Sequence, residues 1–282
     1  MKIKLFLAFL SAVAVNSSTA WAQNADTAYI KVYYTFIQTP DTTRKSYQRE
    51  ENMGLYIGKN MSEYLSLDKL KLDSVKKQQI AQLEANPTGG LVIDARGRKP
   101  TTSTIIINND VNNSKNDTYT VGENLLKNYY YSDECPSINW ELQNEIKKIG
   151  SYTCTKAMGK FRGRTYEVWF TADIPISAGP WKLKGLPGLI LEAADSQNYY
   201  IFKFAGIENM DKSANNFIIN NPPEKYIKTT KKDFTKLQDA ARADPVGFVN
   251  ATSASMGVKM KMLPNNNYVT KKLNNPIELT DE

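Results

Sequence analysis

The stretch IPISAGPWKLKGLPGLILEAAD, residues 174 to 195, decides the fold of this chain. Leu186 precedes a proline, which pushes it toward an extended conformation. Gly188 follows that proline and tolerates a positive φ, so Leu186–Leu189 is predicted to form a type II turn. The apolar run Leu189–Leu191 then predicts a buried strand. We therefore expect a rigid corner that leads directly into a core strand and carries no evident catalytic group.

The residues on both sides of this corner extend the same interpretation. Upstream, Gly179-Pro180 forces a second non-helical corner, and Trp181 is the natural side chain to anchor it. Downstream, residues 195–198 form a polar turn of aspartate, serine, glutamine and asparagine. The apolar segment Tyr199–Phe204 follows this turn, so we expect it to pair with Leu189–Ala194 as an antiparallel hairpin.

The corner also resembles a family motif. The sequence GLPGLI is similar to the motif that names the GLPGLI family of exported Bacteroidetes proteins, and the surrounding residues agree from about residue 140 to residue 204. The matching positions are Gly185, Leu186, Pro187, Gly188, Leu189 and Ile190, together with Gly179, Pro180 and Trp181. The resemblance implies an exported, β-rich protein. It implies no catalytic residues, because that family has no established activity to carry over.

Residues 1–22 are predicted to be a signal peptide. Lys2 and Lys4 give a basic start, Leu5–Val15 is an apolar segment too short to span a bilayer, and Ala22-Gln23 is the expected cleavage site. The alternative, a buried amino-terminal helix, does not account for these three features in this order. We therefore expect the mature chain in the periplasm or cell envelope.

The charge of the mature chain excludes one class of partner. Removing the signal peptide leaves 260 of the 282 residues and lowers the net charge from +7 to +5. Basic residues occur in scattered pairs such as Lys76-Lys77 and Lys231-Lys232, with no block of five or six like charges. We therefore expect no nucleic-acid partner, whereas peripheral contact with an anionic membrane surface stays open.

Many short strands and few helices predict the fold class. The pattern is typical of a mainly β (α+β) protein with a large curved antiparallel sheet or half-barrel and one or two covering helices. One β-rich domain is expected over residues 23–263, followed by a loosely ordered tail over residues 264–282. Helices are predicted at Asp68–Ala85 and Lys231–Ala243. The first is either packed on the sheet or a mobile cover over a ligand cavity.

The two cysteines predict a disulfide bond. Cys135 and Cys154 are equidistant from Asn144-Glu145, where we expect the turn of an antiparallel hairpin. Facing residues in such a hairpin come close enough to be bridged, and an oxidising compartment would keep the bond closed. The bond would stabilise the chain by roughly 3 kcal/mol. Two buried free thiols are the alternative, and a zinc site is excluded because the chain has no histidine and no CxxC.

The available side chains argue against catalysis. The absence of histidine removes the usual general base and the commonest metal ligand, and no Gly-x-Ser-x-Gly elbow is present. No metal or cofactor is expected. Arg162 and Arg164 flank a predicted turn, where they either bind a carboxylate or are solvated. The acids near the central stretch are Asp133, Glu134, Asp173, Glu192 and Asp195.

These observations predict a non-enzymatic protein of the envelope. On this hypothesis a concave sheet binds an apolar or peptide ligand, or an outer-membrane partner. One alternative is a structural or interaction protein whose sheet is filled by its own side chains. A second alternative is a hydrolase that works through carboxylates.

Overall fold

The structure is a computed structural model, and it describes most of the chain from residue 24 to residue 280. The signal peptide predicted over residues 1–22 lies outside the described residues, as does the first part of the predicted tail. The described residues are 24–44, 47–85, 91–93, 101–102, 104–108, 117–124, 127–210, 217–221, 226–255, 260–262 and 274–280.

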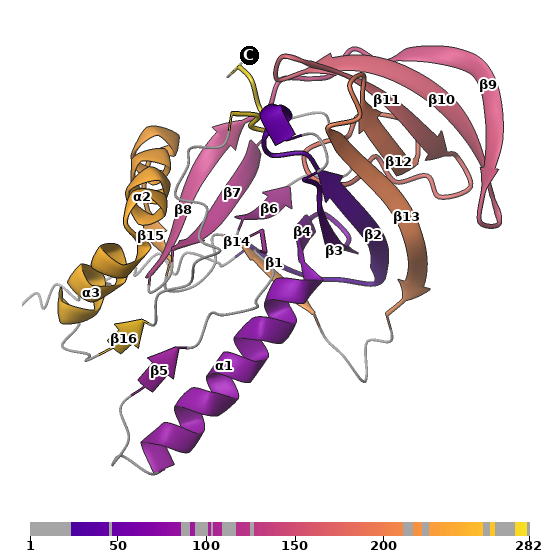
Figure 1. The fold of residues 1–282 in the computed structure, drawn as a ribbon. Helices are drawn as coiled ribbons and strands as arrows, with labels where there is room; N and C mark the ends of the chain where they lie inside the picture. Colours follow the sequence, from indigo (N-terminus) through magenta and orange to yellow (C-terminus); the bar gives the residue numbers. More distant parts are fainter. Residues whose placement is uncertain are drawn as a thin grey trace, which may run out of the picture.

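The described elements are mostly strands (Figure 1). The strands are β1 (Asn24–Thr27), β2 (Ile30–Gln38), β3 (Arg49–Ile57), β4 (Ser62–Ser66), β5 (Leu91–Ile93), β6 (Thr104–Asn108), β7 (Asp117–Asn124), β8 (Lys127–Glu134), β9 (Glu141–Ile149), β10 (Tyr152–Phe161), β11 (Arg164–Thr171), β12 (Leu189–Asp195), β13 (Tyr200–Asn209), β14 (Ile218–Asn221), β15 (Ile227–Lys228) and β16 (Met260–Met262). The helices are α1 (Leu67–Ala85), α2 (Lys231–Ala243) and α3 (Pro245–Ser255), with a 3-10 turn η1 at Thr42–Arg44.

One large sheet organises the described part of the chain. Its strand order is β15-β8-β7-β6-β4-β3-β2-β13-β12-β11-β10-β9, and every neighbouring pair is antiparallel except β15 with β8. Small two-stranded sheets, β1 with β14 and β16 with β5, lie beside it. Figure 1 shows the large sheet curving along its length, with β9 at one end and β8 near the other. The predicted fold class, a large curved antiparallel sheet with few helices, is confirmed.

The curvature has a local cause in the strand register. Pairing shifts occur between Thr155 and Ala157 in β10, between Trp169 and Phe170 in β11, and between Phe204 and Gly206 in β13. Such bulges bend a strand and increase its twist. At the first of them, residues 143–145 of β9 lie opposite the single residue between Thr155 and Ala157.

The main core lies on one face of the curved sheet, and a second, smaller buried cluster that includes Tyr56, Leu65 and Ile107 lies on the other face. Along β11 the buried side chains alternate, with Tyr166 and Val168 fully buried and Phe170 nearly so. Strand β12 is buried on both faces at its start, which explains its unbroken run of apolar residues. The predicted hairpin is confirmed: β12 pairs with β13 through Ala193–Phe202 and Ala194–Ile201.

The corner before β12 differs from the predicted type II turn. Gly188 has no positive φ, whereas Gly185 (φ 101°) and Trp181 (φ 57°) do. Glycine is nevertheless required at 188, because a Cβ there would lie 2.1 Å from the carbonyl oxygen of Thr171. The constraint at this position is therefore a close backbone approach.

Trp181 anchors the upstream corner as expected. Its ring packs edge-on against Phe161, with the ring centroids 5.4 Å apart. A positive φ costs a residue of this size about 1–2 kcal/mol, so these contacts offset a local strain. The chain then folds back on the core strand, where Leu189 N–H donates to the carbonyl of Ile174 at 3.0 Å and Ile190 N–H donates to Ala178 at 2.9 Å.

The helices are attached to the sheet to different extents. Helix α1 begins after Ser66, whose hydroxyl accepts a hydrogen bond from the backbone N–H of Lys69, and Figure 1 shows it projecting away from the sheet. Val75, one of the apolar residues of this helix, is 47% exposed. The side chains of Ile80 and Leu83 lie outside the described residues.

Helix α2 is packed on the sheet. It begins at the predicted residue, after Thr230, whose hydroxyl accepts from the N–H of Asp233. Phe234 then packs against Tyr131 of β8. Among the described residues, none of the helices combines the length and apolar character needed to cross a membrane.

We predict that Gly188→Ala destabilises the protein by about 1–3 kcal/mol, because the new methyl group would overlap the Thr171 carbonyl. Urea unfolding of both proteins measures the change in the free energy of unfolding.

Gly150→Asn is the matched control for this substitution. Its φ of 58° suits asparagine, and a Cβ there meets Phe204 at an ordinary 3.5 Å. Equal losses for the two variants would contradict the close-approach explanation.

Candidate functional site

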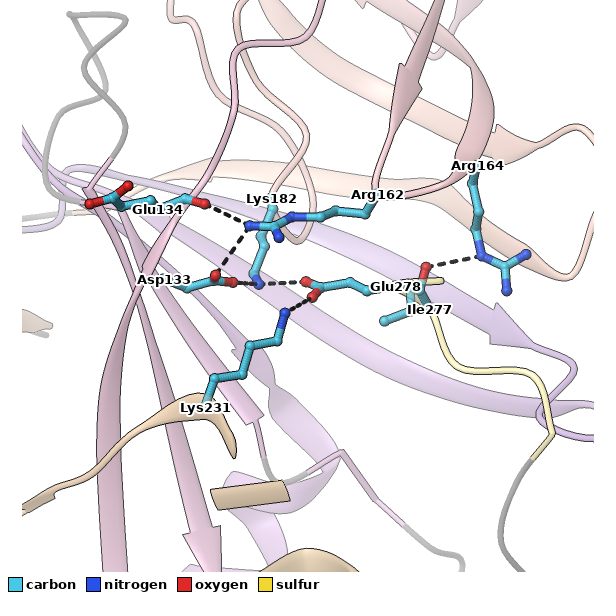
Figure 2. A network of polar contacts seen from close by, with 8 residues as sticks. All are labelled: Asp133, Glu134, Arg162, Arg164, Lys182, Lys231, Ile277 and Glu278. Atoms are coloured by element: carbon cyan, nitrogen blue, oxygen red, sulfur yellow. Dashed lines mark hydrogen bonds and ion pairs between the residues drawn. The ribbon is translucent and has the colours of Figure 1, made fainter. Parts of the chain in front are cut away.

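Five charged side chains meet beside the corner, and we call them the corner network: Asp133, Arg162, Lys182, Lys231 and Glu278 (Figure 2). They come from distant parts of the chain. The end of β8, the turn between β10 and β11, the corner itself, the start of α2 and the carboxyl-terminal segment each supply one side chain.

Asp133 and Glu278 are bridged by Lys182. The ammonium of Lys182 contacts Oδ2 of Asp133 and donates to Oε1 of Glu278 at 2.5 Å. Arg162 Nη2 donates to Oδ1 of Asp133 at 3.1 Å and to the backbone carbonyl of Glu134 at 2.6 Å. Lys231 completes the network by donating to Oε2 of Glu278 at 2.8 Å.

The network is buried at its centre and open at one end. The side chains of Arg162 and Lys182 are each 2% exposed and that of Asp133 is 8% exposed, whereas Lys231 is 33% exposed. Burial lowers the pKa of Lys182, but the carboxylates of Glu278 and Asp133 raise it above its ordinary value. The ammonium is therefore charged throughout the physiological range of pH.

A second arginine ties the carboxyl-terminal segment to the sheet. Arg164 pairs with Asp195 at 2.9 Å and donates to the carbonyls of Pro276 at 2.6 Å and Ile277 at 2.9 Å. Residues 274–280 of the tail that was expected to be loosely ordered are thus held against the β10–β11 turn. Both arginines at this turn therefore bind carboxylates, which is the first of the two interpretations of the sequence.

The predicted disulfide is absent, because both cysteines are buried free thiols. The β9–β10 hairpin turns at Gly150, whose φ of 58° suits glycine, and not at Asn144-Glu145. Cys154 therefore faces Lys147, while Cys135 follows β8. Burial raises the pKa of the Cys154 thiol to about 11, which makes it a weak nucleophile.

A small pocket adjoins the network between β4, β6 and the corner. Its volume of about 10 Å³ suits a single water molecule, so this pocket does not match the large apolar cavity expected for a bound ligand. The lining residues are Ser62, Tyr64, Ile106, Asn108, Ala178, Gly179, Trp181, Lys182, Leu183 and Lys184.

The other acids named from the sequence are dispersed. Glu134 has an exposed side chain, Asp173 accepts from the N–H of Thr153, and Glu192 pairs with Lys147. Asp133 alone among them belongs to the corner network. Within the described residues, no group of three or more acids and cysteines is placed to hold a metal ion.

Sequence reasoning missed three members of the network. Lys182 carried a signal, because a lysine beside Trp181 in an apolar corner is unusual unless it is paired. Lys231 marked the start of a predicted helix but carried no sign of an ion pair, and Glu278 carried no signal, since it lies 96 residues from Lys182.

Glu63 of β4 carries a buried carboxyl group. It lies on the face of the sheet opposite the pocket, because its neighbours Ser62 and Tyr64 line that pocket. It faces Tyr56 across the strand pair, and its exposure is 9%. Burial raises its pKa from 4.5 to about 8. The folded state therefore holds a proton that the unfolded chain releases between these two pH values.

We predict that Glu63→Gln flattens the pH dependence of stability. Because the folded pKa is raised, Glu63 lowers the free energy of unfolding as the pH rises from about 4.5 to about 8. Across this range the free energy of unfolding of the variant should rise by a few kcal/mol relative to that of the natural protein. The expected change is on the order of 1.4 kcal/mol per unit of pKa shift. Urea unfolding at pH 5 and pH 8 measures this, and a constant difference at both values would contradict it.

We also predict that Asp133→Asn destabilises the protein by roughly 3–5 kcal/mol, because it leaves Lys182 and Arg162 buried with less compensation. The control is Asp239→Asn, whose pair with Arg242 is exposed and whose loss should cost about 0–1 kcal/mol. Thermal or urea unfolding distinguishes them, and similar small losses would show that the network is not stabilising.

A family model described as "N-glycanase peptide, N-terminal domain" matches residues 88–233. Two similar solved structures are described as PNGF-II in a P21 and in a C2 space group; each is 12% identical to this chain and covers 74% of it, with TM-scores of 0.49 and 0.48. The alignments cover 32% of those chains, so this chain spans about a third of their length. No curated protein matches.

The match corrects two expectations from the sequence. The resemblance to the GLPGLI family was wrong, because the family model that matches is a different one; a six-residue motif describes one corner of this fold and does not decide its family. The expectation of a non-enzymatic protein was also wrong, because the family model that matches is that of the N-terminal domain of an N-glycanase, which is an enzyme family.

Proposed function

We propose a function from one premise: the chain belongs to the family of the N-glycanase peptide N-terminal domain, whose model spans more than half of its residues. We infer that the chain takes part in hydrolysing the amide bond that joins an N-linked glycan to an asparagine side chain. The match over residues 88–233 is the observation that supports this function. We further propose that the chain acts outside the cytoplasm, after removal of residues 1–22.

The matched segment contains most of the corner network. Asp133, Arg162, Lys182 and Lys231 all lie within residues 88–233, and Glu278 joins them from outside it. We therefore assign the chemistry of amide hydrolysis to the corner network.

Amide hydrolysis requires a base for the attacking water and a positive group near the amide oxygen, where negative charge develops. With no histidine in the chain, we take a carboxylate of the network as the base. Glu278 is the more accessible of the two network carboxylates, at 14% against 8% for Asp133. We assign the water-activating role to Glu278.

The roles of the other charged groups follow from their positions in the network. Lys231 lies at the open end of the network and would stabilise the amide oxygen as the water adds to the carbon. The proton that Glu278 takes from water then passes to the departing nitrogen, which leaves an aspartate and a glycosylamine. Asp133 is a positioning residue, because it contacts Arg162 and Lys182 and lies deeper than Glu278.

The experiment is an assay of the purified exported chain with an N-glycopeptide. Mass spectrometry should record release of the glycan together with conversion of its asparagine to aspartate. Glu278→Gln should lower the rate by about 10²-fold or more, with circular dichroism confirming that the variant is folded.

Glu134→Gln is the matched control, because Glu134 is an exposed carboxylate next to Asp133 and contributes its backbone carbonyl to the network. Its rate should equal that of the natural protein. Absence of glycan release by the natural chain would overturn the proposed function, and equal rates for the two variants would overturn the role of Glu278.

A further inference from the structure

Trp169 alternates along β11 with the buried residues Val168 and Phe170, and it is partly buried and packs against the edge of the core. Glu167, two residues earlier on the strand, is likewise partly exposed. The part of the indole that stays exposed keeps an apolar ring surface in contact with water, and aromatic residues of this kind are enriched at recognition surfaces.

Charged side chains from four adjacent strands surround the indole. The lysines are Lys147 of β9 and Lys156 of β10, and the acids are Glu145 of β9, Glu167 of β11 and Glu192 of β12. We call Trp169 and these five residues the Trp169 patch. Pairing across the strands places them side by side, because Trp169 faces Lys156 on one side and Glu192 on the other.

The patch holds the ring in a fixed orientation. Nε1 of Trp169 donates to Oε1 of Glu167 at 3.3 Å. Lys156 pairs with Glu145 at 3.0 Å and with Glu167 at 3.1 Å, which fixes the acceptor in turn. A ring oriented in advance loses little freedom when a ligand stacks on it.

The ammonium of Lys147 lies 4.3 Å from the centroid of the indole, over its face. It is also paired with Glu192 at 2.6 Å and is 38% exposed. A lysine side chain is long and flexible, so a ligand can take its place over the ring while the ammonium moves aside to donate to that ligand.

The charge of the patch selects the class of ligand. Two lysines and three glutamates nearly cancel, so the patch does not favour a strongly anionic or cationic partner. It offers a flat ring flanked by alternating hydrogen-bond donors and acceptors. A neutral sugar has the complementary surface, with polarised C–H bonds on one face and hydroxyl groups around its rim.

We propose that the Trp169 patch binds a neutral oligosaccharide by stacking a sugar ring on Trp169, with Lys147 and Glu192 hydrogen-bonded to its hydroxyls. The inference rests on the proposed function in one respect, since an N-linked glycan is the oligosaccharide that the family match suggests. The patch contains no member of the corner network, so glycan binding here is a role separate from hydrolysis.

The test is direct binding of a free, neutral N-glycan, already released from its peptide, to the purified chain. Isothermal calorimetry and saturation-transfer NMR should show binding by the natural protein and a loss of at least tenfold in affinity for Trp169→Ala. Trp169→Phe keeps an aromatic face and should fall between them. Tyr29→Ala, which removes an exposed aromatic ring that is not in the patch, should bind as the natural protein does.

A second variant keeps the test independent of folding. Glu192→Gln leaves the indole in place and should weaken binding severalfold while the unfolding midpoint stays near that of the natural protein. Failure of the natural protein to bind the glycan, or equal affinity for Trp169→Ala and Tyr29→Ala, would overturn the inference.

The outcomes separate the two proposals. Because the released glycan lacks the amide bond to asparagine that the proposed amidase would cleave, binding without glycopeptide hydrolysis would support the patch and reject the amidase. Hydrolysis without patch-dependent binding would do the reverse.

Discussion

The ammonium of Lys182, enclosed between the carboxylates of Asp133 and Glu278, is the interaction on which the described structure depends most. A lysine that is 2% exposed is tolerated only where its charge is compensated. Here the compensation comes from the end of β8 and from the carboxyl-terminal segment. The corner that carries Lys182 can therefore occupy its place only when both distant segments have docked.

This dependence explains how a long curved sheet keeps a defined shape. Strands β8 and β11 are far apart in the strand order, and hydrogen bonding between neighbouring strands alone does not fix the distance between them. Arg162, in the turn just before β11, contacts Asp133 at the end of β8, and Lys231 brings α2 to the same point. The corner network thus joins two regions of the sheet across its curvature, where a small change in bulge geometry would otherwise move them.

The extent of prediction from sequence follows from the range of the forces involved. The strand-rich fold, the β12–β13 hairpin and the start of α2 depend on local patterns of apolar residues and turns, and they were predictable. The disulfide failed because one glycine, Gly150, placed the hairpin turn six residues beyond the assumed centre. The corner network was out of reach, because Lys182 and Glu278 meet only through the tertiary fold. Residues that form a buried ion pair at long range leave no periodicity to detect.

The irregular pairing of β9 with β10 also bears on how the molecule behaves among its own copies. Strand β9 ends the described sheet and exposes Leu142 and Ile146, at 59% and 67%. An edge strand with exposed apolar side chains is a template on which another chain can add. Residues 143–145 bulge between those two side chains, so an incoming strand meets a break in the ladder after a few residues. Stepwise growth of a fibre along this edge is interrupted by the same distortion that curves the sheet.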